Sequence, residues 1–70
     1  MNCYIVLTQI VHEGPTPLAV FVRKQDAELL EGILNDYIKS GVKATLPFGL
    51  LWEYIPYFDS ASVVVSRFLG

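Results

Sequence analysis

Residues 24–40, KQDAELLEGILNDYIKS, form the stretch of sequence that decides the fold. Apolar side chains recur in it at intervals of three and four residues, the period of an amphipathic α-helix, at Ala27, Leu30, Ile33, Leu34, Tyr37 and Ile38. The opposite face is polar, with Glu28, Glu31, Asn35 and Lys39. Gly41 follows the last periodic residue, where helices commonly end. The pattern predicts a helix over 24–40, with Gly32 marking a close backbone approach.

Three further segments are predicted to be strands. Residues 3–11 are rich in β-branched and aromatic types and apolar on both faces, which is typical of a central strand covered on both sides. In so short a chain, we expect the second cover to come from another subunit. Residues 12–17, with Gly14 and two prolines, are predicted to form a loop, followed by a second, antiparallel strand at 18–22. Residues 62–69 form the last predicted strand.

The chain between the helix and the last strand is irregular. Residues 42–45 fit either a short strand or an extended connection. Residues 46–58 are predicted to be an aromatic loop with one helical turn near 50–54, because Pro47, Gly49 and Pro56 limit regular structure. The order β-β-α-loop-β predicts a single α+β domain over 1–70, with one amphipathic helix packed on a face of a small antiparallel sheet of three to four strands.

The composition excludes several classes of protein. Hydrophobic residues make up 53% and charged residues 17%, which excludes intrinsic disorder. The net charge of −2 argues against general nucleic-acid binding, and no uncharged apolar window is long enough for a membrane span. One cysteine permits no internal disulfide, and residues 1–3 lack the positive start of a signal peptide. We therefore expect a cytoplasmic protein.

Catalytic and metal-binding motifs are absent from the sequence, so we expect no enzyme activity, no cofactor and no metal site. Cys3 and His12 lie about 30 Å apart on an extended strand, too far for a nucleophile and its base. His12 and Glu13 are interpreted as parts of a solvated turn. An enzyme with residues shared between subunits is the less favoured reading.

The aromatic loop is the main candidate for partner binding. A domain of this size buries only about 60% of the surface of its unfolded chain, so some large apolar side chains are expected to form an interface. The candidate partner-binding residues are Leu51, Trp52, Tyr54, Tyr57 and Phe58. The competing interpretation places Phe48, Trp52 and Phe58 in the core beneath the loop.

A second candidate site binds anions. Arg23 and Lys24 stand at the predicted helix N-terminus, and Lys43 or Arg67 adds a third positive charge. A nucleotide-like ligand suits such a site, with an aromatic ring such as Tyr54 or Trp52 stacked on its base. The alternative is a set of ordinary solvated cations.

The runs Tyr4-Ile5-Val6, Val20-Phe21-Val22 and Asp26-Ala27-Glu28-Leu29 resemble a pattern in small bacteriophage accessory proteins. The resemblance covers about the first forty residues, and the aromatic C-terminal third departs from it. It implies a compact, non-enzymatic protein in the host cytoplasm that binds host machinery or sequesters a host signalling molecule.

Two functions follow as hypotheses. The favoured one is a protein–protein interaction module, a phage-type anti-defence inhibitor that binds a host protein sterically as a homo-oligomer. The alternative is an oligomeric sponge that encloses a nucleotide-like anion between subunits.

Overall fold

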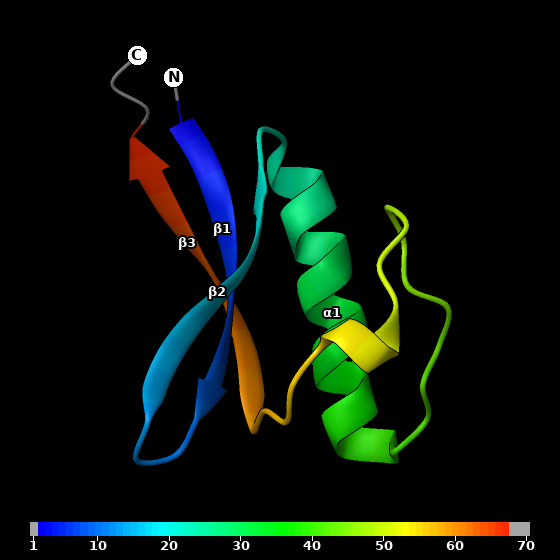
Figure 1. Ribbon diagram of the computed structural model, residues 1–70. Coiled ribbons are helices and arrows are strands. Elements are labelled where there is room, and N and C mark those ends of the chain that lie inside the picture. Colours follow the sequence, from blue (N-terminus) through cyan, green and yellow to red (C-terminus); the bar gives the residue numbers. More distant parts are fainter. Residues whose placement is uncertain (1, 68–70) are drawn as a thin grey trace.

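The computed structural model describes residues 2–67. Its elements are β1 (Asn2–Ile10), β2 (Gly14–Phe21), α1 (Lys24–Ser40), the short 3₁₀ turn η1 (Trp52–Tyr54) and β3 (Ser60–Arg67). The three strands form one antiparallel sheet in the order β2-β1-β3, and α1 lies on one face of it (Figure 1). The predicted α+β class is confirmed, with three strands and with β1 in the centre.

Helix α1 has the predicted bounds, and its apolar stripe forms the middle of the core. Ala27, Leu30 and Leu34 are fully buried against Val6 of β1. Burying each of the two leucines stabilises the fold by about 1.5–3 kcal/mol. The helix ends at Gly41, whose φ of 75° is left-handed and whose N–H donates to the Tyr37 carbonyl at 2.7 Å.

Strand β2 begins earlier than the sequence indicated, and the predicted loop over 12–17 is wrong. The hairpin turn occupies only 11–13, and β2 starts at Gly14, which pairs with Ile10. Two prolines fit into the strand because β2 is an edge strand, where a missing N–H on the outer side breaks no ladder bond. A bulge follows them, since the register shifts between Val6 and Leu7.

The remaining boundaries move by one or two residues. β1 ends at Ile10 and β3 begins at Ser60, while positions 68 and 69 of the predicted last strand lie outside the described residues. Residues 42–45 are an extended connection, and the predicted helical turn is η1.

Only one face of the sheet is covered by the helix. On the other face Val20 and Val64 are 58% and 40% exposed. Ile5 lies between them and is half-buried, as is Leu7 on the same face. The sequence predicted that both faces of the sheet are covered, but residues 2–67 place a helix on one face only.

The helical pattern predicted that Asn35 lies on the solvent-facing side of the helix, but its side chain contacts β3 instead. Its Nδ2 donates to the Ala61 carbonyl at 3.1 Å, and the Ala61 N–H donates to its Oδ1 at 3.0 Å. A single amide side chain thus pairs with the backbone of β3 in the way that a neighbouring strand does. We call this pair the Asn35 clamp.

Loss of the Asn35 clamp is expected to destabilise the fold. Asn35→Ala removes two partly buried hydrogen bonds and leaves the Ala61 peptide groups unpaired, which lowers the free energy of unfolding by about 2–3 kcal/mol. Asn35→Asp keeps the acceptor for the Ala61 N–H but sets a carboxylate against the Ala61 carbonyl. Urea unfolding followed by Trp52 fluorescence measures both variants, and a loss under about 0.5 kcal/mol in each would contradict the clamp.

Two glycines of the helix region are expected to respond in opposite ways to alanine. A Cβ added at Gly32 meets nothing within 4 Å, so the predicted close backbone approach is wrong, and Gly32→Ala raises stability by about 0.5–1 kcal/mol. The space around Gly41 is equally open, but its φ of 75° makes Gly41→Ala destabilising by about 1 kcal/mol. Thermal unfolding compares the two variants, and a shift in the same direction for both would contradict this assignment.

Candidate functional site

A groove of ≈ 390 Å³ lies between the last turn of α1 and the chain that runs from η1 to β3. Its walls are mostly apolar and aromatic, and a cation and a carboxylate are its charged groups. We call it the aromatic groove; its lining residues are Tyr37, Ile38, Gly41, Lys43, Trp52, Ile55, Pro56, Tyr57, Phe58 and Asp59.

Tyr37 is the central ring of the groove. The Trp52 ring centroid lies 4.9 Å from that of Tyr37, and the Phe58 centroid lies 6.1 Å from it, both in tilted packing. The Trp52 indole is fixed by a hydrogen bond from its Nε1 to the Ala44 carbonyl at 2.7 Å. Local sequence explains this arrangement, because Gly41 ends the helix and turns the chain back along it.

Lys43 supplies the positive charge of the groove. Its Nζ lies 5.9 Å from the centroid of the Tyr37 ring, within the range of a cation–π contact. The groove therefore presents one cation beside aromatic faces.

Asp59 holds the other end of the groove in place. One carboxylate oxygen accepts the Tyr57 hydroxyl at 2.6 Å, and the other accepts the Val11 N–H at 2.7 Å, which ties the hairpin turn to the start of β3. The Tyr57 hydrogen bond, followed by that from Val11, lowers the pKa of Asp59. The same hydrogen bond and the nearby negative charge raise the pKa of Tyr57.

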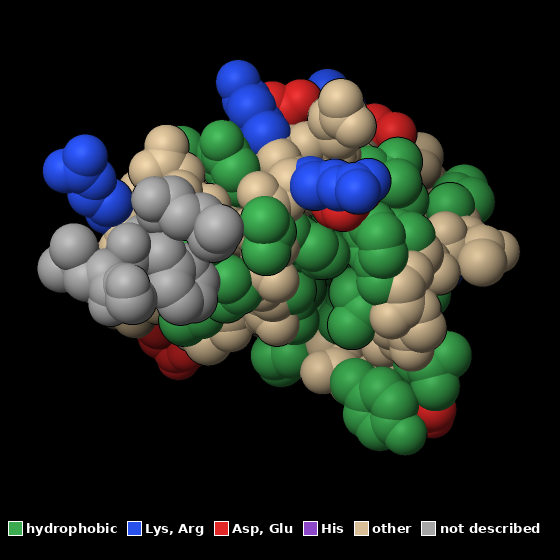
Figure 2. All heavy atoms as spheres, turned by 90° about the horizontal axis from the view of Figure 1, so that it is seen from above, with side chains coloured by type: hydrophobic (Ala, Val, Ile, Leu, Met, Phe, Trp, Pro, Cys, Tyr) green, Lys and Arg blue, Asp and Glu red, His purple; other side chains and the backbone are tan. Residues whose placement is uncertain are grey.

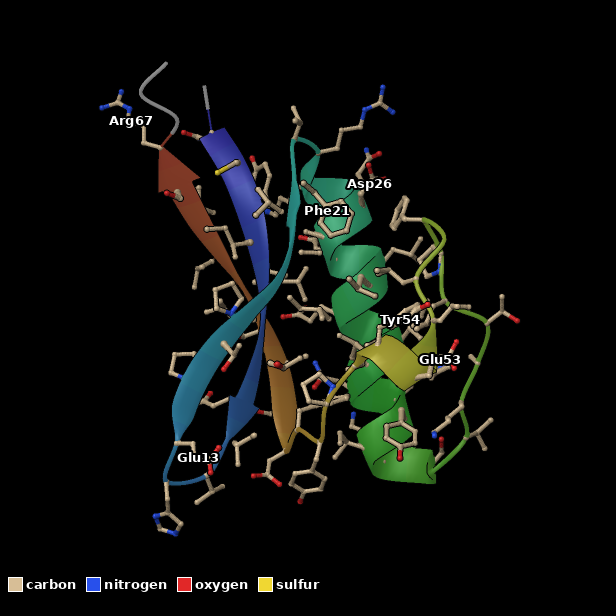
Figure 3. All side chains as sticks on the ribbon, in the orientation of Figure 1. Glu13, Phe21, Asp26, Glu53, Tyr54 and Arg67 are labelled. Carbon is tan, nitrogen blue, oxygen red and sulfur yellow. The ribbon has the colours of Figure 1, made fainter. Side chains whose placement is uncertain are left out.

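The predicted partner-binding residues take different positions. Tyr54 and Tyr57 are 73% and 74% exposed and Leu51 is exposed, whereas Trp52 is half-buried in the groove wall. Tyr54 belongs to η1, which passes in front of α1 in the view of Figure 3. Phe58 is buried in the core, so it supports the groove from beneath and is not a surface anchor.

Phe48, which one interpretation placed in the core, is half exposed. It has a φ of 61° and is followed by Gly49 with a φ of 73°, so both central residues of this tight turn are left-handed. Its ring packs on Phe21 at 5.0 Å between centroids, which ties the loop to the end of β2. Phe21 points from that strand toward the helix and the loop (Figure 3).

The three candidate anion-binding residues are not brought together within one chain. Arg23 and Lys24 precede and begin α1, while Lys43 follows its far end, about 25 Å along the helix axis. Lys24 pairs with Glu28 at 3.6 Å. Lys and Arg side chains stand at separate points of the face seen from above, among hydrophobic and acidic ones (Figure 2). Of the three, only Lys43 belongs to the groove.

The sequence did not indicate that Tyr37, Ile38 and Asp59 belong to a binding site. Tyr37 and Ile38 were assigned to the buried stripe, but α1 carries them beside the aromatic loop, and Ile38 remains 43% exposed. Asp59 was not singled out. Its position directly before a strand was the available signal, because a carboxylate there reaches free backbone N–H groups of neighbouring turns.

The nucleophilic and metal-binding side chains lie at separate places in the described residues. Within residues 2–67 no three His, Cys, Asp or Glu side chains gather as metal ligands. Cys3 is buried near the start of β1, and His12 lies beyond its end, beside Glu13 at the hairpin turn (Figure 3).

Comparison of the chain with protein-family models, with curated proteins and with solved structures finds no match in any of the three. Within the described part of the chain, α1 is neither long nor apolar enough to cross a membrane.

The Asp59 hydrogen bonds are expected to make stability fall at both extremes of pH. The lowered pKa of Asp59 stabilises the fold above the unfolded value of about 4, and this contribution is lost as pH falls through the folded value. The raised pKa of Tyr57 stabilises the fold below about pH 10, and this contribution is lost as pH rises through the folded value.

Urea unfolding between about pH 2 and pH 11 measures this dependence. Asp59→Asn is expected to flatten the acid limb, and Tyr57→Phe the alkaline limb. Asp36→Asn, which removes an exposed carboxylate of α1, serves as the control and keeps the wild-type profile. An acid limb of unchanged steepness in Asp59→Asn would show that these hydrogen bonds do not form in solution.

Proposed function

We propose that this protein is a non-enzymatic binding module that takes an aromatic or aliphatic side chain of a protein partner into the aromatic groove. The observation that carries the proposal is the groove itself, ≈ 390 Å³ in volume and lined by four aromatic side chains. That volume falls within the range of typical ligand sites, which combine apolar walls with a few polar groups.

The surroundings of the groove support a protein partner. Tyr57 lines it and is 74% exposed, while Tyr54 and Leu51 add exposed apolar surface on and next to η1. Exposed tyrosines next to a concave apolar site are typical of protein interfaces, because a rigid ring gives a large contact area with little loss of conformational entropy. The Asp59 hydrogen bond holds the Tyr57 hydroxyl in one place before a partner arrives.

Lys43 favours a second candidate, a nucleotide-like anion. Its ammonium group beside the Tyr37 ring suits an aromatic ligand that carries a negative charge. One cation neutralises little of a phosphate, however, and Arg23 and Lys24 lie at the other end of the helix. The neutral side chain of a protein is therefore the preferred occupant.

Two parts of the proposal rest on the resemblance to small phage accessory proteins. The first is that the partner is a host protein, and the second is that binding inhibits this partner sterically in the host cytoplasm. Both remain parts of the proposal. The groove contributes the chemical class of the contact, an apolar anchor inserted between aromatic rings.

A random peptide library selected on the immobilised full chain tests the proposal. Selected peptides are expected to share an aromatic or large aliphatic residue, and calorimetry measures their affinity. Ile38→Lys places a charge in the groove wall and is expected to weaken binding at least about tenfold. The matched control is Leu29→Lys, a 52% exposed position of the same helix that does not line the groove.

Adenosine monophosphate, titrated into the labelled chain and followed by NMR, tests the alternative. Saturable shifts at the Trp52 indole that vanish in Lys43→Ala would favour the anion over the peptide. Selected peptides that bind Ile38→Lys and Leu29→Lys equally well would place the interface elsewhere and refute the groove as the binding site.

A further inference from the structure

The two edges of the sheet differ in their capacity to pair with another strand. In β2, Pro15 and Pro17 stand opposite Gln9 and Leu7 of β1. Neither proline has an N–H, so the outer edge of β2 lacks two of its donors. In contrast, β3 contains no proline, and its one charged residue, Arg67, stands at its end.

The Asn35 clamp shows which backbone groups of β3 face outward. Asn35 pairs with both the N–H and the C=O of Ala61, so these groups point away from β1. In an antiparallel ladder the N–H and C=O of a residue point to the same side, and successive residues alternate. The backbone groups of Val63, Val65 and Arg67 therefore also face outward, and no residue within 2–67 pairs with them.

This part of the edge is accessible. Figure 1 shows β3 close to α1 at its start and moving away from it toward its end, where the helix no longer accompanies the strand. Val65 is 61% exposed and Val64, on the opposite face, is 40% exposed. The side chain of Arg67 points away from the sheet (Figure 3).

We propose that this edge of β3 pairs with β3 of a second copy of the chain, antiparallel about a two-fold axis at Val65. In this register Val65 stands opposite its own counterpart, and Val63 stands opposite Arg67 in both directions. All three outward residues then exchange backbone hydrogen bonds, and the pairing stops where Asn35 occupies Ala61. The product is one continuous six-stranded sheet.

Charge supports a second copy as the occupant. The register sets each Arg67 opposite a neutral Val63 and separates the two arginines by about 13 Å, whereas a parallel, in-register pair would place them side by side. On one face Val65 packs on Val65, and on the other Val64 stands opposite Ser66. In this register neither Arg67 stands opposite another charged residue.

The size of the contact sets its strength. A pairing of about five residues buries less than the roughly 800 Å² per partner of a standard interface. We therefore expect a weak dimer that depends on concentration. This interface does not involve the aromatic groove, so the proposal stands or falls independently of the proposed function.

Sedimentation equilibrium of the full chain from about 5 µM to about 500 µM tests the proposal. The mass is expected to rise from 7.8 kDa toward twice that value. Val65→Pro removes an outward N–H that the ladder with β1 does not use, so the chain should fold and remain monomeric. Val65→Lys places two positive charges opposite each other at the two-fold axis, so this variant should also fold and remain monomeric. Val20→Lys, 58% exposed on β2, is the matched control and should dimerise like the wild type.

Oxidative cross-linking tests the register. In a Cys3→Ala background, Val65→Cys is expected to form a disulfide-linked dimer, because directly opposed residues bring their Cα atoms to about 5.5 Å. Val64→Cys should cross-link far less. A wild-type chain that remains at 7.8 kDa throughout the range would overturn the proposal. So would dimers of unchanged strength in folded Val65→Pro or Val65→Lys, or cross-linking of Val64→Cys equal to that of Val65→Cys.

Discussion

The pairing of the Asn35 amide with the Ala61 peptide groups is the interaction on which the arrangement of the molecule depends. It joins the middle of α1 to the outer edge of β3 near the start of that strand. The last turn of α1, with Tyr37 and Ile38, consequently stands next to the aromatic loop and forms one wall of the groove. The same clamp closes only the first part of the β3 edge and leaves the rest open.

The loop after the single helix contributes side chains to the hydrophobic core. Phe58 and Leu46 of the loop are buried in the core, and Phe48 reaches the end of β2 through its contact with Phe21. Asp59 then connects the loop to the hairpin turn. Loop, helix and one face of the sheet therefore form one core, and the second face of the sheet remains uncovered by residues 2–67.

The groove and the β3 edge are separate surfaces with different chemistry. The groove has fixed rings, one cation and one carboxylate, whereas the open edge of β3 has unpaired backbone groups, and its side chains are neutral except for Arg67 at the end of the strand. The proposed dimer through β3 would carry two grooves on one continuous sheet. Two weak contacts to a partner with repeated sites would then act together, so binding would gain strength without any new contact.

The sequence by itself determined the local elements. A period of three and four residues with Gly41 at its end defined α1, and continuous apolar residues identified β1 as central. Tertiary structure decided what covers each face, because that depends on contacts between residues far apart in the chain. In the helical pattern Asn35 stands among the solvated residues, yet its side chain forms the clamp because the fold brings Ala61 of β3 next to it. The prolines of β2 were compatible with a strand only because that strand lies at the edge of the sheet.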